Sequence, residues 1–179
     1  MSEEINHENS LDALKEIRDE FVAQWGVMGT QWGINRTMAQ IHALLMTSSR
    51  SLSTDEVMEE LQISRGNAHT NLKELVSWGL IRIMTKKGER KEFFEAEKDV
   101  WEMFRRICHE RKRRELDPAL EVVTRCKEET AGMDGEEAEA FHKQMADLEE
   151  FVSFGSRMTE RVASMQHGKA MQLAIKLFG

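Results

Sequence analysis

Apolar residues in the first 47 positions recur every three or four places, which is the spacing of a stripe along one side of a helix. The first stripe comprises Leu14, Ile17, Phe21, Trp25 and Met28. The second, between about residues 35 and 47, comprises Met38, Ile41, Leu44 and Leu45. Three glycines between positions 26 and 33 predict a bend or a close backbone contact between the two stripes.

Polar residues mark where the next two helices begin. Ser53 and Glu56 have the spacing of a capping box, so a short helix is expected to begin there and to end near Gln62. Ser64 is the cap of a further helix, which stops at Gly79. The apolar side of that helix comprises Ala68, Leu72, Leu75 and Val76.

The pattern then changes to that of two short strands. Residues 80–84 and 92–96 are rich in strand formers, and the charged segment 86–91 with its glycine predicts a turn between them. A helix, a short helix, a helix and a charged hairpin form the plan of a winged helix-turn-helix.

Helical patterns resume after the hairpin. Asp99 can cap a long helix through about Cys126, and Pro118 suits a restart of that helix because proline fits a first helical turn. Residues 128–136, with two glycines, predict a linker.

A last helical region follows this linker. Its apolar residues are Phe141, Met145, Leu148, Val152, Met158, Val162 and Met165. Gly155 and Gly168 are expected breaks in it.

Composition supports long helices and argues against a membrane protein. The 179 residues include one proline and 11 glycines, a balance that favours helices over a sandwich or barrel. No apolar run approaches the roughly 18 residues needed to cross a bilayer, and the acidic N-terminus is unlike a secretory signal. Two separated cysteines, Cys108 and Cys126, fit a reducing compartment. We expect a cytoplasmic protein.

Charge is distributed unevenly along the chain. The net charge is -7, yet residues 64–94 hold seven lysines and arginines against three acidic residues, a local charge of +4. An acidic body with one basic segment is typical of a DNA-binding module, because attraction to phosphate is local. A solvated charged surface is the alternative interpretation.

The polar side of the helix that Ser64 caps has the residues that DNA reading requires. Opposite the apolar side lie Gly66, Asn67, Thr70, Lys73, Glu74 and Ser77, with Ser64 and Arg65 at the N-terminus. Asn67 and Thr70 are the candidates for base reading, because an Asn amide can pair with adenine and Thr offers a hydroxyl and a methyl. Arg65 and Lys73 are candidates for phosphate contacts.

The hairpin turn concentrates positive charge. Lys86, Lys87, Arg90 and Lys91 stand within six residues and can lie along the DNA backbone or the minor groove. Such contacts add affinity and read little sequence. The alternative is a soluble hairpin tip with no DNA contact.

Several segments together resemble one known family. They are residues 29–33, 63–67, 75–81, 88–97 and 110–115. In them the chain resembles the GbsR-like branch of the MarR-type bacterial regulators, over about residues 11 to 125. The resemblance implies a homodimeric winged-helix repressor, and some members of this branch respond to osmoprotectants such as choline. The segment after about residue 130 adds nothing to the match.

Other chemistries find little support. No catalytic, phosphate-binding or dinucleotide-binding motif is present, so we expect no enzyme and no cofactor. Cys108 and His109 lack a partner pair at metal-site spacing, which argues against a metal. Arginines near Cys108 suggest a reactive thiol, although an inert buried thiol is the preferred interpretation. Trp25 and Trp32 are the weak candidates for an aromatic cage around a cationic effector.

We therefore expect a mainly α protein with three parts. Residues 1–34 form an N-terminal dimerisation helix and bend, 35–98 a winged helix-turn-helix domain that binds double-stranded DNA, and 99–179 C-terminal helices for dimerisation with a candidate effector region. Its function would be to repress transcription by binding an inverted repeat as a homodimer. The alternative is a helical adaptor whose winged helix binds protein instead of DNA.

Overall fold

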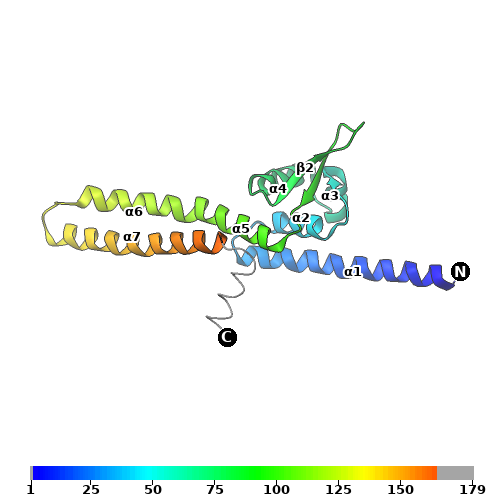
Figure 1. Cartoon of the computed structure of the whole chain (residues 1–179), viewed down its shortest axis with the longest axis horizontal. Coiled ribbons are helices and arrows are strands. Elements are labelled where there is room, and N and C mark those ends of the chain that lie inside the picture. Colours follow the sequence, from blue (N-terminus) through cyan, green and yellow to red (C-terminus); the bar gives the residue numbers. More distant parts are fainter. Residues whose placement is uncertain (1, 165–179) are drawn as a thin grey trace. The chain divides into compact units, whose positions relative to one another are not determined.

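The computed structural model describes the backbone of residues 2–164 and the side chains of residues 12–164. The chain divides into two compact units, residues 1–98 and 99–179. Figure 1 shows the elements of both units in sequence colours. None of the described helices is both long and apolar enough to cross a membrane.

The first unit is a winged helix preceded by a long helix. Its elements are α1 (Ser2–Gln31), α2 (Arg36–Thr47), β1 (Leu52–Ser53), α3 (Thr54–Leu61), α4 (Arg65–Ser77), β2 (Ile81–Thr85) and β3 (Glu92–Ala96). The strands form an antiparallel sheet in the order β1-β3-β2. The predicted helices and hairpin are confirmed. Strand β1 was not predicted, because two residues carry no alternation that could distinguish a strand.

The core of this unit lies beneath α4. Ile41 and Leu45 of α2, Val57 of α3, and Leu72 and Leu75 of α4 are almost completely buried. Burial of this apolar surface is the main source of stability, at about 25 cal/mol per Å². Because the inner side of α4 is held in this core, the position of its outer side is set by packing.

Local signals decide where α3 and α4 begin and end. The Ser53 hydroxyl accepts a bond from the Glu56 N–H at 3.3 Å, and a Glu56 carboxylate oxygen accepts the Ser53 N–H at 2.7 Å, which confirms the capping box. Ser64 caps α4 in the same way, through the Asn67 N–H. Gly79 follows α4 with a φ of +68°, a left-handed conformation that favours glycine.

The glycines near the end of α1 serve close packing and do not bend the helix. Helix α1 runs through Gly26 and Gly29 to Gln31, so the predicted bend is confined to Trp32 and Gly33, whose φ is +73°. A Cβ on Gly29 would lie 2.6 Å from the Cβ of Ala39 in α2. The alternative prediction of a close backbone contact is therefore confirmed.

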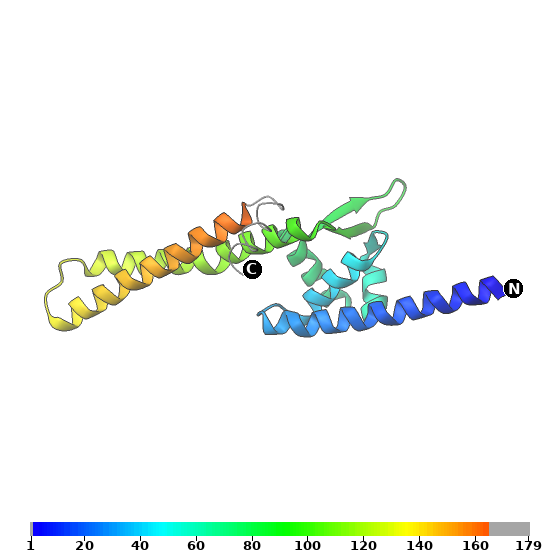
Figure 2. The same cartoon turned by 60° about the horizontal axis from the view of Figure 1, so that its bottom comes forward.

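The second unit is a helical hairpin. Helix α5 (Val100–Arg111), the π-helical segment η1 (Lys112–Leu116) and α6 (Asp117–Thr130) follow one another directly, and α7 (Glu136–Ala163) returns beside α6. Figure 2 shows α6 and α7 running antiparallel. Asp99 caps α5 through the N–H groups of Trp101 and Glu102, and Pro118 lies in the first turn of α6, as predicted.

Two boundaries in this unit were predicted wrongly. The first three residues of the expected linker are the last turn of α6, and the connection itself is 131–135, with positive φ at Gly132 and Gly135. Gly155 does not break α7, because one glycine costs a helix only about 1 kcal/mol and α7 packs against α6. The expected break at Gly168 and the apolar Met165 lie outside the described residues.

Candidate nucleic-acid interface

Helix α4 presents a polar side to solvent. Ala68, Asn71, Leu72 and Leu75 are buried. The exposed residues at and after its N-cap are Ser64, Arg65, Gly66, Asn67, His69, Thr70, Lys73 and Ser77. Glu74, expected on the same side, is half-buried and accepts a bond from the Trp78 Nε1 at 2.9 Å, because it lies at the edge of the helix one turn from that ring. The predicted residues other than Glu74 are therefore exposed.

Asn67 is exposed and held by its neighbours. Its Oδ1 accepts a bond from Nδ2 of the buried Asn71 at 2.7 Å, and its Nδ2 lies 3.4 Å from the Thr37 hydroxyl of α2. These contacts fix the orientation of the Asn67 amide. Such an amide can donate one hydrogen bond to the edge of a base and accept another from it. Asn71 was missed as a site residue because it lies on the buried side of α4.

His69 extends the positive side of α4. It is exposed and stands one turn after Arg65 and one turn before Lys73, so the three lie in a row along the helix. This spacing of four is the sequence signal that could have identified it.

Gly66 has open space around it. A Cβ built on this residue would meet no heavy atom of the described residues within 4 Å, and its φ lies outside the left-handed region. The fold therefore does not require glycine here. A molecule that approaches the helix backbone closely from outside would require glycine at this position.

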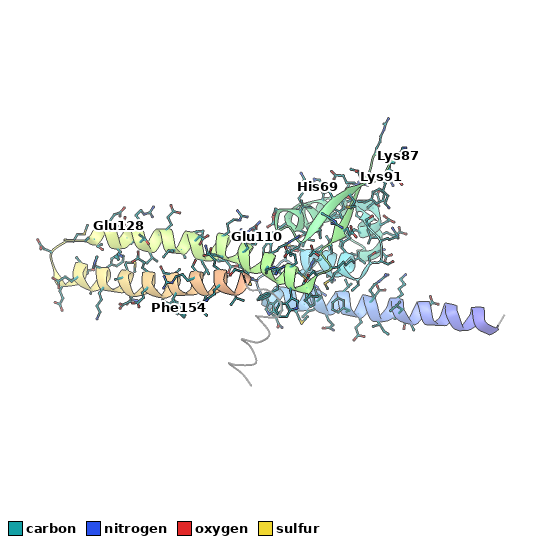
Figure 3. All side chains as sticks on the ribbon, in the orientation of Figure 1. His69, Lys87, Lys91, Glu110, Glu128 and Phe154 are labelled. Atoms are coloured by element: carbon teal, nitrogen blue, oxygen red, sulfur yellow. The ribbon has the colours of Figure 1, made fainter. Side chains whose placement is uncertain are left out.

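The four cations of the wing differ in what surrounds them. The Lys86 ammonium lies 3.7 Å from the centre of the Phe93 ring, and Lys91 lies 3.4 Å from an Asp55 carboxylate oxygen. Within the part of the chain that the structure describes, Lys87 and Arg90 make no ion pair. Gly88, at φ +87°, makes the tight turn between them. Figure 3 shows Lys87, Lys91 and His69 pointing to the same side of this unit.

Acidic residues neutralise part of the basic segment. Arg65 lies 2.5 Å from Asp55 of α3, and Arg82 lies 2.9 Å from Glu95 on the neighbouring strand. The hydrogen bond from Arg65 and its positive charge, with a further contribution from Lys91, lower the pKa of the Asp55 carboxyl. Asp55 is thus charged at neutral pH between two cations of the proposed interface.

The two tryptophans of the candidate aromatic cage differ in their exposure. Trp25 is half-buried, with its ring centre 5.4 Å from that of Phe21, whereas Trp32 follows the end of α1 and is 62% exposed. One tryptophan ring is therefore partly covered by its own helix.

The Cys108 thiol is half-buried. Burial raises its pKa, and this effect outweighs the opposing charge of Arg111. Desolvation therefore supports the preferred interpretation of an inert thiol. Among the described residues, no group of three or more His, Cys, Asp or Glu side chains is arranged to hold a metal ion.

Comparisons with known proteins agree with the fold and the resemblance. No family model matches the chain. It is 23% identical over 159 residues to the HTH-type transcriptional repressor GbsR of Bacillus subtilis (strain 168), covering 84% of this chain and 88% of that protein. Its fold is similar to that of a solved transcriptional regulator, with a TM-score of 0.63 and 15% identity over 86% of this chain and 97% of that one. The chain therefore has a winged-helix fold and is similar to GbsR-like transcriptional regulators, which are not enzymes.

Proposed function

We propose that this regulator binds double-stranded DNA as a homodimer and represses transcription from an inverted-repeat operator. Helix α4 enters the major groove, Asn67 and Thr70 contact base edges, and the wing lies on the DNA backbone. The observation that carries the proposal is the exposed polar side of α4, held by a buried core and flanked by a basic hairpin in the same unit.

The side chains of α4 suit a groove. Arg65, His69 and Lys73 form its positive row, and Gly66 leaves room for a phosphate or sugar against the helix backbone. A major groove is wide enough for an α-helix, and the donors and acceptors of Asn67 match adenine. The wing adds sequence-independent affinity through Lys87 and Arg90, whose charges are available for phosphate.

Exposed apolar surface supports the homodimer. Leu14 and Ile17 of α1 are 61% and 65% exposed, and Phe151 and Phe154 of α7 are 72% and 56% exposed. Phe154 points away from α6 in Figure 3, and spacing places Phe151 and Met158 on the same side of α7. Apolar stripes of this size mark interaction surfaces, and a two-fold dimer is the commonest closed assembly.

Selection of bound duplexes from a random pool tests the base-reading part. Asn67→Ala and Thr70→Ala should each cost about 1 to 3 kcal/mol on the selected site while binding to random duplex changes little. Equal losses on both duplexes would remove these residues from base reading. A protein without salt-dependent affinity for any duplex would favour the protein-binding adaptor.

A further inference from the structure

One carboxylate links three elements of the first unit. Asp55, in the first turn of α3, lies 2.5 Å from the guanidinium of Arg65 at the start of α4. Its other oxygen lies 3.4 Å from the ammonium of Lys91 at the base of the wing. The recognition helix and the wing thus share one anion, supplied by a helix that has no part in the proposed base reading.

The Asp55 carboxylate occupies the place between Arg65 and Lys91 that a DNA phosphate could take. A phosphate between α4 and the wing offers two oxygens to the same two cations. The partners remain open to such a group, since the side chains of Arg65 and Lys91 are 68% and 60% exposed and that of Asp55 is 46% exposed.

We infer that Asp55 is an internal competitor for DNA phosphate, which holds Arg65 and Lys91 together in the free protein and must release them when DNA binds. The inference rests on the proposed DNA binding and deepens it by identifying a residue that sets affinity. Release costs the two ion pairs and leaves a carboxylate near the DNA backbone. Asp55 therefore weakens binding to every sequence.

Replacing the carboxylate without changing its shape tests the inference. Asp55→Asn should tighten binding to a dye-labelled random-sequence duplex by roughly three- to tenfold at low salt, because exposed ion pairs are individually weak and two are removed. Glu59→Gln is the matched control: Glu59 lies in the same helix, is exposed and makes no ion pair with the described residues. It removes the same charge from the whole molecule and should have a clearly smaller effect.

A second background shows whether Asp55 acts through its two partners. In the Arg65→Ala/Lys91→Ala protein, the further change Asp55→Asn should raise the affinity clearly less than it does in the parent, because only the repulsion between carboxylate and phosphate remains to be relieved. The capping box of Ser53 and Glu56 is untouched in all these variants, so thermal unfolding should show that each one folds.

Three results would overturn the inference while the proposed function stands. The affinity of Asp55→Asn could equal that of Glu59→Gln, it could be lower than that of the parent, or the gain from Asp55→Asn could be equally large without Arg65 and Lys91. A parent protein that binds no duplex in a salt-dependent manner would overturn both the proposed function and the inference. The parent titration therefore separates the two failures.

Discussion

At the scale of single residues, Gly66 is a position where the proposed interface, and not the fold, requires glycine. Glycine in a helix costs about 0.5 to 1 kcal/mol relative to alanine, and the structure around Gly66 has room for a methyl group. Because Gly66 weakens its helix and no packing contact requires it, we infer that DNA approaches the helix backbone closely at this position.

We predict that Gly66→Ala raises the free energy of unfolding by about 0.5 to 1 kcal/mol and weakens binding to the selected duplex. Urea unfolding and fluorescence anisotropy measure the two effects. Ser77→Ala, at the exposed far end of the same helix, is the control for substitution as such. Undiminished affinity of Gly66→Ala would show that DNA does not approach the N-terminal turn of α4.

His42 shows how burial alone changes a titration. It lies in α2 and is 5% exposed, and its Nε2 has no hydrogen-bond partner among the described residues. Burial lowers its pKa to about 4, because the charged ring would lose its hydration. The unfolded chain keeps a pKa near 6.5 and so binds the proton more readily than the folded protein does.

The first unit should therefore lose stability as the pH falls from about 6.5 towards 4, by up to roughly 3 kcal/mol. Urea unfolding followed by tryptophan fluorescence at several pH values in this range measures the loss. In His42→Leu the loss should be much smaller, whereas His69→Gln, which removes an exposed histidine, should keep the parent profile. Identical profiles for the parent and His42→Leu would show that His42 is not the group responsible.

At the scale of elements, we expect the four cations of the wing to contribute unequally to DNA affinity although they carry the same charge. Lys86 rests on the Phe93 ring and Lys91 on Asp55, while Lys87 and Arg90 stand on either side of the Gly88 turn without an ion pair to any described residue. The two cations without internal ion pairs can turn to phosphate without breaking an existing one.

Lys87→Ala/Arg90→Ala should thus weaken binding to all duplexes and flatten the dependence of log affinity on log salt by about 0.9 for each phosphate that is no longer neutralised. Lys86→Ala/Lys91→Ala has the same change of charge and should have a smaller effect. Titrations at three or more salt concentrations give both slopes. If Lys87→Ala/Arg90→Ala leaves the slope of the parent intact, the tip of the wing does not contact DNA.

At the scale of the whole molecule, exposed apolar residues occur in both compact units. Leu14 and Ile17 belong to the first unit, and Phe151 and Phe154 to the second. Each pair lies on one side of a helix, so each can pack against a helix of a second copy.

We predict that the protein is a dimer at micromolar concentration and that Phe151→Glu/Phe154→Glu or Leu14→Glu/Ile17→Glu shifts it towards monomer in light scattering. Phe151→Leu/Phe154→Leu keeps the apolar character and should remain dimeric. Footprinting should show two half-sites about one helical turn, roughly 34 Å, apart. A parent monomer that protects one half-site would contradict the homodimer.

Interactions within one or two turns of the chain determined much of this protein. Ser53, Ser64 and Asp99 cap helices through N–H groups two or three residues away, and Gly79 ends α4 by its own conformation. The hairpin and the two sides of α4 follow from residue spacing in the same way. These features were predictable because the partners are neighbours in the sequence.

Only the tertiary structure decided which distant segments meet. Position 29 requires a glycine because Ala39 packs against it, and β1 exists because Leu52 pairs with Phe94. Asp55 comes to lie between Arg65 and Lys91, 10 and 36 positions further along the chain, only when α3, α4 and the wing pack together. A spacing pattern carries no information on such contacts, because they depend on the folded path of the backbone rather than on local periodicity.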